Sequence, residues 1–320
     1  MKNIAILTGG DSAECDISIL SANTVLKHLN PKFFNSYIIY LKNNNFYTYI
    51  KKNKIDVDKS NFSFEIENKC ISFDAIFMAL HGSPAENGLI QPYFDKLNIP
   101  YTSCNAEVSA LTFNKYECNK KLKELGFNCA NSFFYKKGDS IAEEEVITRI
   151  ELPCFVKPNG AGSSFGITKV KKKEDLTKAI NMALEYDNKV LIEQFICGIE
   201  VSCGAFNNKK NIQALPITEI VTENEFFDYQ AKYEGKSQEI TPARISEKLT
   251  VEIQKLTIEV YKAMRLNGIC RIDYIIMKGK PYIIEINTIP GLTEESIIPQ
   301  QVKSAKLKLS IIFKNCLLNN

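Results

Sequence analysis

The stretch RIDYIIMKGKPYIIEIN, residues 271–287, contains two apolar runs that are separated by the tripeptide KGK. Polar and apolar residues alternate in both runs, which is typical of strands with one buried face. A short break that contains glycine between two such runs predicts a β-hairpin. The hairpin therefore brings polar residues from two separate runs onto one surface.

The register of the predicted hairpin determines which polar residues face each other. If the chain folds symmetrically about Gly279, the facing pairs are Met277 with Pro281, Asp273 with Glu285, and Arg271 with Asn287. Residues two apart on a strand share a face, so the polar side chains of these pairs are expected to lie together.

The residue types on this face suit a metal and a phosphate. Two facing carboxylates repel each other unless a cation lies between them. The oxygens of Asp273, Glu285 and Asn287 are ligands that Mg²⁺ accepts beside water and phosphate. Arg271 could hold a phosphoryl or carboxylate group through two hydrogen bonds. A solvated sheet face without a metal is the alternative interpretation.

A second stretch, VKPNGAGSSFGITKV at residues 156–170, is a glycine- and serine-rich loop between two strand-like runs. It lacks the Gly-Lys-Ser/Thr of a Walker A loop, and no helix opens after it as in the dinucleotide-binding fingerprint. Backbone N–H groups of such a loop can bind phosphate without a helix, and Lys157 at its entrance could reach the same phosphates. The residues alone support a structural hairpin and a phosphate-binding flap equally.

The chain has 320 residues, enough for two or three packed domains. Near the N-terminus, strand-like runs alternate with helical patterns, which predicts an α/β domain with a parallel sheet. Helical spacing of apolar residues then extends from Ala106 to Gly126, before a strand-rich middle that holds the flap. The predicted division is into residues 1–103, 104–190 and 191–320.

Composition and charge exclude several classes of protein. The chain is 45% hydrophobic and 24% charged, and no apolar run approaches the ~18 residues of a membrane-spanning helix. Its net charge is only +3 with lysines spread throughout, so we expect no nucleic-acid partner. The ten cysteines are scattered without a C-x-x-C pair, and no signal-peptide pattern opens the sequence. We therefore expect a cytoplasmic protein with reduced thiols and no membrane contact.

The two stretches belong to a series of motifs in a fixed order. The others are GGDSAECDIS at residues 9–18, ALHGSPAENG at 79–88, VLIEQFICGIEVS at 190–202, FDYQAKYEGKSQEITPA at 227–243 and EINTIPGLTEESIIP at 285–299. In this order, over nearly the whole sequence, the chain resembles the D-alanine:D-alanine ligase family of the ATP-grasp superfamily. The resemblance implies an N-terminal Rossmann-like α/β domain followed by a two-part ATP-grasp fold with ATP between two β-sheets.

The resemblance also implies a reaction. The carboxylate of one D-alanine would take the γ-phosphoryl group of ATP to become an acyl phosphate. The amine of a second D-alanine would displace phosphate and form D-alanyl-D-alanine for peptidoglycan. Phosphoryl transfer depends on positioning and charge neutralisation, so lysines, Mg²⁺ and arginine are the expected equipment. The assembly that the family implies is a homodimer.

By the same resemblance, three sets of residues would bind ATP and metal. The flap would cover the phosphates with Gly162, Ser163 and Ser164. Lysines from three segments would contact the phosphates: Lys115, Lys157 and Lys232. One segment would meet the base and the ribose: Glu193, Gln194, Phe195 and Ile196 at the adenine, and Glu200 at the ribose. Two Mg²⁺ ions, which Mn²⁺ can replace, would be held by Asp273, Glu285 and Asn287.

The first D-alanine would be held through its charges. Glu14 would pair with its ammonium group, and His81 would lie near its carboxylate. Tyr233 and Ser163 would hydrogen-bond to each other and connect to Glu14, which closes the site against water. A purely structural histidine is the alternative for His81. The AENG that follows, residues 85–88, stands where the family has Gly-Glu-Asp-Gly.

The second D-alanine would meet the end of the hairpin and the segment after it. The N–H of Gly291 would form an oxyanion site with Arg271, and Ser296 would bind the second carboxylate, unless it only caps a helix. Ile297, next to the acceptor, stands where the family usually has leucine. An ATP-grasp ligase with D-serine or D-lactate as acceptor, and an ATP-binding protein without catalysis, are therefore the alternative functions.

Overall fold

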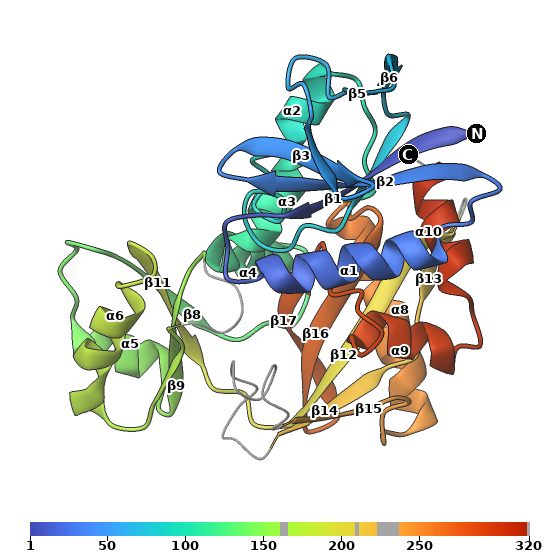
Figure 1. Cartoon of the computed structure of the whole chain (residues 1–320). Helices are drawn as coiled ribbons and strands as arrows, with labels where there is room; N and C mark the ends of the chain where they lie inside the picture. The colour runs from blue at the N-terminus through green and yellow to red at the C-terminus, as the bar shows by residue number, and fades with distance from the viewer. Residues whose placement is uncertain (161–165, 209–210, 223–236, 319–320) are drawn as a thin grey trace.

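The computed structural model of the protein describes residues 1–160, 166–208, 211–222 and 237–318 (Figure 1). The predictions for Gly162, Ser163, Ser164, Lys232 and Tyr233 lie outside these residues. Within the described ranges, no helix is both long and apolar enough to cross a lipid bilayer. The strands of the same ranges form three larger sheets and one short two-stranded sheet.

The first sheet contains five strands in the order β4-β3-β2-β1-β7. Its central part is parallel, because β1 pairs in parallel register with β2 on one side and β7 on the other. The outer strands β3 and β4 are antiparallel. The strands are β1 Lys2–Gly9, β2 Phe34–Lys42, β3 Asn45–Ile50, β4 Asn53–Asp56 and β7 Ala75–Met78. The predicted N-terminal α/β domain with parallel pairing is confirmed, and it carries an antiparallel edge.

Helices and a small hairpin cover the two faces of this sheet. Helix α1 (Cys15–His28) returns the chain from β1 to the parallel β2, as a parallel pair requires. Ile4 and Ile6 pack in a core with α1, whereas Ala5 and Leu7 belong to a second, phenylalanine-rich core. The elements near this second core are α2 (Gln91–Lys96), β5 (Phe64–Ile66) and β6 (Lys69–Ile71).

The second sheet is antiparallel, with the strand order β10-β9-β11-β8. Its strands are β8 Ser132–Lys136, β9 Cys154–Pro158, β10 Thr168–Val170 and β11 Lys189–Gln194. Its core includes residues of α5 (Glu143–Ile150) and α6 (Leu176–Ala183), and a short 3₁₀ helix, η1 (Lys173–Asp175), precedes α6. The glycine-rich stretch connects β9 to β10, so it joins two strands as predicted.

The third sheet follows the order β15-β14-β12-β16-β17, with β13 beside β12. Its strands are β12 Ile199–Asn208, β13 Asn211–Ala214, β14 Thr218–Thr222, β15 Ser237–Ile240, β16 Ile269–Met277 and β17 Lys280–Asn287. The helices of this part are α8 (Glu247–Ala263), α9 (Ile297–Ser304) and α10 (Leu309–Leu318). Figure 1 shows the first sheet above the third and the second sheet to one side.

The turn of the β16–β17 hairpin is shorter than predicted. Met277 faces Lys280 instead of Pro281. The two residues between them, Lys278 and Gly279, have φ of 50° and 77°. Positive φ at both central residues is typical of a type I′ turn, whose twist matches that of the flanking strands. The expected symmetrical pairing about Gly279 is therefore wrong at the turn.

A bulge farther along the hairpin restores the predicted register. The pairing shifts between Asp273 and Tyr274, where Ile284 is the extra residue. Near the bulge, the N–H of Ile283 donates to the main-chain oxygen of Asn128 at 2.8 Å, so a segment outside the hairpin binds β17 there. Beyond the bulge, two predicted pairs are confirmed: Arg271 with Asn287, and Asp273 with Glu285.

The helical run predicted from Ala106 to Gly126 is two helices, α3 (Ala106–Phe113) and α4 (Lys115–Glu124). Asn114 between them has an extended backbone, and its side chain caps α4 by accepting an N–H at 3.1 Å. Asparagine is a strong N-cap residue. The capping preference at one position therefore divides a run whose apolar spacing is continuous.

This division places the start of α4 beside the glycine-rich loop. Asn159, just after β9, accepts the N–H of Lys115 through its main-chain oxygen at 3.2 Å and the N–H of Tyr116 through its side chain at 2.9 Å. Its amide group donates to Asn114 at 2.9 Å. Lys115 and Lys157, two residues before Asn159, are thus held in one region of the molecule.

The observed packing differs from the predicted division of the chain. Buried residues between 104 and 129, including Val108 and Leu122, belong to the core of the third sheet. The predicted boundary at residue 190 falls inside β11, which ends at Gln194. The second sheet with its helices is therefore a smaller unit than the predicted segment 104–190.

Gln301 on α9 bridges a gap in the third sheet, between the ends of β13 and β14 along β12. The side chain is fully buried. Its oxygen accepts the N–H of Gly204 at 3.0 Å, and its amide donates to Ser202 O at 2.9 Å and to Thr218 Oγ1 at 3.1 Å. The carboxamide thus acts as a strand peptide group would. It also holds α9, and the segment that precedes it, against the sheet.

We expect Gln301→Leu to lower the free energy of unfolding by about 2–5 kcal/mol, because it leaves buried polar groups of Gly204 and Ser202 without partners. Urea denaturation monitored by circular dichroism measures the change. The control is Lys303→Gln on the exposed face of the same helix, which should change stability by less than about 0.5 kcal/mol. Similar small effects of both substitutions would contradict the bridging role.

Candidate active site

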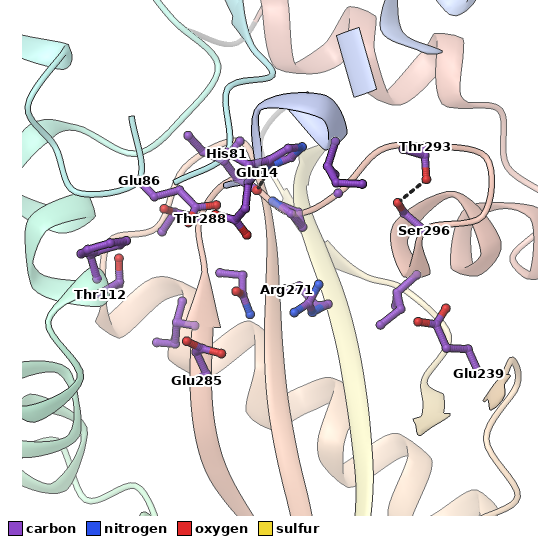
Figure 2. Close-up of a pocket in the computed structure, with 18 of the residues that line it drawn as sticks. Glu14, His81, Glu86, Thr112, Glu239, Arg271, Glu285, Thr288, Thr293 and Ser296 are labelled. Carbon is purple, nitrogen blue, oxygen red and sulfur yellow. Dashed lines mark hydrogen bonds between the residues drawn. The ribbon is translucent and has the colours of Figure 1, made fainter. Parts of the chain in front are cut away.

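A cavity of about 340 Å³ is lined by residues that follow strands β1 and β7 of the first sheet, by residues of the third sheet and the segment after it, and by the α3–α4 junction. Figure 2 shows side chains from these separate segments arranged around Arg271. Nine of the predicted site residues line the cavity: Glu14, His81, Lys115, Arg271, Glu285, Asn287, Gly291, Ser296 and Ile297. The hairpin face, the start of α1 and the segment before α9 therefore contribute to one site.

Arg271 and Asp273 form a forked ion pair at the base of the cavity. Nε of Arg271 donates to Oδ1 of Asp273 at 2.8 Å, and Nη2 donates to Oδ2 at 2.9 Å. Ser202 Oγ donates to Oδ1 at 2.6 Å and Asn287 Nδ2 donates to Oδ2 at 2.9 Å. Four donors to one buried carboxylate compensate its desolvation and fix the arginine in place.

Arg271 remains charged although its side chain is only 18% exposed. Burial by itself lowers the pKa of Arg271, but the carboxylates of Asp273, Glu285 and Glu239 together raise it above its ordinary value. A permanent cation with several N–H groups is thus held at the base of the cavity. Such a group can bind a phosphoryl or carboxylate oxygen without moving.

The donor set on the hairpin fits a hard divalent cation. Asp273 and Glu285 face each other on adjacent strands, and Asn287 lies on the same face of β17 as Glu285. The amide of Asn287 donates to Asp273 through Nδ2, so its oxygen is the atom that can act as a ligand. Glu285 also lies 3.5 Å from Nζ of Lys115. The oxygens of Glu285 and Asn287 suit Mg²⁺, whereas Asp273 would have to exchange one of its four donors for the metal.

His81 connects the first sheet to the segment that follows the hairpin. Its Nδ1 lies 2.8 Å from the main-chain oxygen of Ile289, and its Nε2 lies 2.8 Å from Oγ of Ser21. Because a carbonyl only accepts, Nδ1 carries the proton and Nε2 accepts from the serine. Ser21 in turn accepts the N–H of Leu292 at 3.1 Å.

These contacts favour a positioning role for His81 over direct binding of a carboxylate. Both ring nitrogens bond within the protein, and the side chain is buried. Burial lowers the pKa of His81, although the bond to Ile289 and the charge of Glu14 act in the opposite direction. The neutral imidazole therefore ties Ile289, and through Ser21 also Leu292, to the first sheet. Gly291 lies between these two anchored residues.

Glu14 lies against Gly82, the residue after His81. A Cβ at Gly82 would come within 2.8 Å of Oε2 of Glu14, and the glycine has a φ of +71°. Only glycine allows both the backbone conformation and this close approach. The short loop after β7 therefore determines where the Glu14 carboxylate enters the cavity.

The residues predicted to contact the nucleotide base lie mainly on the second sheet. Lys157 and Glu193 form a buried ion pair at 2.6 Å, and Asn119 donates to the other oxygen of Glu193 at 3.2 Å. The N–H groups of Gln194 and Phe195 donate to main-chain oxygens, so both already have partners within the protein. Glu200 follows on β12, facing Ile220 of β14 and Ile275 of β16.

Both ends of the flap contact one turn of the second sheet. The N–H of Gly160 donates to Oδ2 of Asp187 at 2.8 Å. Gly166 has a φ of +69°, and a Cβ there would come within 2.7 Å of the Tyr186 ring. The turn that contains Tyr186 and Asp187 therefore binds the entrance of the loop at Gly160 and packs closely against Gly166 at its exit.

Family models match nearly all of the chain. Residues 3–104 match the model described as "D-ala D-ala ligase N-terminus", and residues 122–317 match "D-ala D-ala ligase C-terminus". The chain belongs to the D-alanine–D-alanine ligase family. The resemblance seen in the motif order is thus confirmed over both halves of this ligase.

Individual relatives agree with the family models. A D-alanine–D-alanine ligase of Flavobacterium johnsoniae is 46% identical, over 99% of this chain and 98% of that protein. The crystal structure of the VanG D-Ala:D-Ser ligase from Enterococcus faecalis is 32% identical, with a TM-score of 0.87 over 98% of both chains. A Bacillus anthracis D-alanine–D-alanine ligase complexed with ATP is 26% identical, with a TM-score of 0.80 over 99% of this chain and 96% of that chain. The ATP-grasp fold class is confirmed by these structures.

The ligase cavity also contains acidic residues that the sequence did not single out. Burial raises the pKa of Glu86 well above its ordinary value, and the charges of Glu14 and Glu285 raise it further. Burial also raises the pKa of Glu239, against the lowering effects of Arg271 and a hydrogen bond. Both residues lie inside the quoted motifs, but neither follows a strand or faces another acid in a local pattern.

We expect the low pKa of His81 to make the ligase less stable below about pH 6.5, the ordinary histidine value. Below that pH, His81 binds a proton in the unfolded chain but not in the folded protein. The contribution of the neutral His81 to the free energy of unfolding is therefore complete above that pH and is lost as the pH falls. The difference in free energy of unfolding between wild type and His81→Gln should therefore become smaller as the pH decreases. The gap should narrow by up to about 1.4 kcal/mol per pH unit in urea denaturation at pH 5–7.5. A gap that does not vary with pH would contradict a buried neutral His81.

Proposed function

We propose that the protein is an ADP-forming ligase that joins two D-alanines into D-alanyl-D-alanine for cell wall synthesis. The observation that carries this proposal is the arrangement of Arg271 and Glu285 on the hairpin, opposite Glu14, in a chain of this family. A site of this kind offers a fixed cation for phosphoryl oxygens and a carboxylate for a substrate ammonium.

The family uses ATP, and the proposed nucleotide site lies between the second and third sheets. Lys115 and Lys157 would neutralise phosphate charge, with the flap above them and Glu200 at the ribose. Asp273, Glu285 and Asn287 would hold two Mg²⁺ ions. Bound Mg²⁺ neutralises the charge that develops on the phosphates during transfer.

In the first step, an oxygen of the donor carboxylate attacks the γ-phosphorus of ATP, and ADP leaves. Glu14 holds the donor ammonium, at the position that Gly82 determines. Arg271 remains charged throughout and binds oxygens of the transferring group. The product is an acyl phosphate, which reacts with water unless the site is closed. Ser163 and Tyr233 are proposed to close it.

In the second step, the acceptor ammonium loses a proton and its amine attacks the acyl carbonyl. The C–N bond forms, the acyl C–O bond to phosphate breaks, and phosphate leaves while the amide nitrogen releases its second proton to solvent. The N–H of Gly291 and the guanidinium of Arg271 would stabilise the oxyanion. The bonds from His81 to Ile289 and from Ser21 to Leu292 support this role, because they hold the residues around Gly291. Ser296 would bind the acceptor carboxylate, with Ile297 against its side chain.

D-Serine is the second candidate acceptor, because the VanG protein, 32% identical to this chain, is named a D-Ala:D-Ser ligase. Ile297 is the residue proposed to contact the acceptor side chain. The test compares ADP and phosphate release with D-alanine alone, with D-alanine plus D-serine, and with D-alanine plus D-lactate, each followed by mass analysis of the product. We expect D-alanyl-D-alanine to dominate. No phosphate release with D-alanine alone would contradict the leading function.

Glu285→Gln should abolish turnover while the protein stays folded. The substitution keeps the side chain's shape but removes the negative charge that a divalent cation requires. Steady-state ADP release and a thermal melt measure the two properties. Lys280→Gln, exposed on the same strand, is the matched control and should keep wild-type activity. A Glu285→Gln enzyme of near-normal rate would refute the metal assignment.

The proposed ligase is a homodimer in the cytoplasm. Leu20 and Leu26 are exposed on α1, where burial against a second copy would remove apolar surface from water. All ten cysteines are free thiols, which agrees with a reducing compartment. Sedimentation equilibrium of wild type and Leu20→Asp would test the assembly. The proposed units are the first sheet with its helices, a small unit around residues 132–194, and the third sheet together with α3 and α4.

A further inference from the structure

Carboxylates lie on two sides of Arg271 in the cavity. Glu14 and Glu86 lie on the side of the first sheet, and Glu239 lies on the opposite side, near Ser296 (Figure 2). The proposed donor ammonium occupies the Glu14 side. A second carboxylate on the other side has no role in the steps described above. The reaction, however, has a second substrate that also enters with an ammonium group.

Glu239 is held by the helix that begins at Ser296. Its Oε2 accepts a hydrogen bond from Nε2 of Gln300 at 2.8 Å, and the same Nε2 donates to the main-chain oxygen of Glu295 at 2.7 Å. Gln300 lies one turn after Ser296 in α9. The amide therefore fixes the carboxylate of β15 to the first turn of α9, on the side of the cavity away from Glu14.

The start of α9 is suited to a carboxylate. Ser296 does not cap this helix with its side chain, because its hydroxyl bonds to Thr293 Oγ1 at 2.7 Å. The N-terminal end of a helix carries partial positive charge and attracts anions. A Cβ at Gly291 would come within 2.8 Å of Oγ of Ser296, so the proposed oxyanion residue lies directly beside this helix start.

We propose that Glu239 binds the ammonium group of the acceptor amino acid and that Gln300 positions Glu239 for this contact. The inference rests on the proposed ligase function. The acceptor would lie with its carboxylate toward Ser296 and its ammonium toward Glu239, which places its nitrogen on the Arg271 side of the cavity. Donor and acceptor ammonium groups are then separated by the arginine, so that each has its own carboxylate.

Among the described residues, Glu239 is a partly buried acid that forms no direct ion pair, although the charge of Arg271 acts on it across the cavity. Gln300 supplies one neutral hydrogen bond, whereas a charged partner would compensate the desolvation of the carboxylate more fully. The acceptor ammonium is that partner. An acceptor with a hydroxyl in place of the ammonium would leave Glu239 uncompensated, so the residue favours amines.

The test separates the two half-reactions. Acyl phosphate formation needs only the donor, and hydroxylamine traps it as D-alanine hydroxamate. Dipeptide synthesis needs both amino acids, and its dependence on D-alanine concentration gives the acceptor KM. We expect Glu239→Gln to raise the acceptor KM by about tenfold to a hundredfold, the loss typical of a charged hydrogen bond. Hydroxamate formation should stay within about twofold of wild type.

Three further variants sharpen the result. Glu239→Asp keeps the charge and should recover part of the acceptor affinity. Gln300→Leu should raise the acceptor KM by a smaller factor, again without changing hydroxamate formation. Glu294→Gln is the matched control. Glu294 is an exposed acid in the loop before α9, where it pairs with Lys27, and the variant should behave as wild type.

Two results would overturn the inference: an unchanged acceptor KM in Glu239→Gln, or an equal loss of hydroxamate and dipeptide formation. The second result would place Glu239 in donor binding or in folding. Failure of the ligase function itself looks different, because the wild-type protein would then form neither hydroxamate nor dipeptide from D-alanine.

Discussion

The forked pair between Arg271 and Asp273 is the interaction around which the cavity is organised. A buried ion pair is stable only when its remaining hydrogen-bonding groups are satisfied. Ser202 and Asn287 meet that requirement from strands on both sides of β16. The arginine is thus immobile and charged, and the carboxylates of the cavity lie around it at separate points. Substitution of either partner would remove the strongest compensation for the other charge, so Asp273 also serves to position Arg271.

The segment between the hairpin and α9 depends on two different parts of the molecule. His81, in the loop after β7, binds it at Ile289, and Ser21 of α1 binds it at Leu292. Gln301 binds the following helix to the third sheet. Gly291 and Ser296 lie within this stretch. The contacts that fix their positions therefore come in part from residues far away in the sequence. The proposed oxyanion and acceptor sites therefore exist only when the first and third sheets are packed together.

The sequence predicted which polar residues share a face of the hairpin, but it did not predict the turn and the bulge that bring them together. Arg271, Asp273, Glu285 and Asn287 meet as expected because a shorter turn and a bulge at Ile284 shift the register in opposite directions. Local alternation predicts strands, whereas turn type and bulge depend on a positive φ at Lys278 and on the contact of β17 with Asn128. Glu239 could not be predicted, because its place depends on Gln300, which is 61 positions away in the chain.

The side chains that line the cavity carry more negative than positive charge. Among the lining residues that the structure describes are five acids and, besides the neutral His81, two cationic residues. The acids are Glu14, Glu86, Glu239, Glu285 and Glu295, and the cations are Lys115 and Arg271. Burial raises the pKa of Glu86, and the like charges of Glu14 and Glu285 raise it further. The cations of the proposed reaction, two ammonium groups and a divalent metal, would each reduce that repulsion. Binding of one cation would on this basis lower the negative charge that the next one meets.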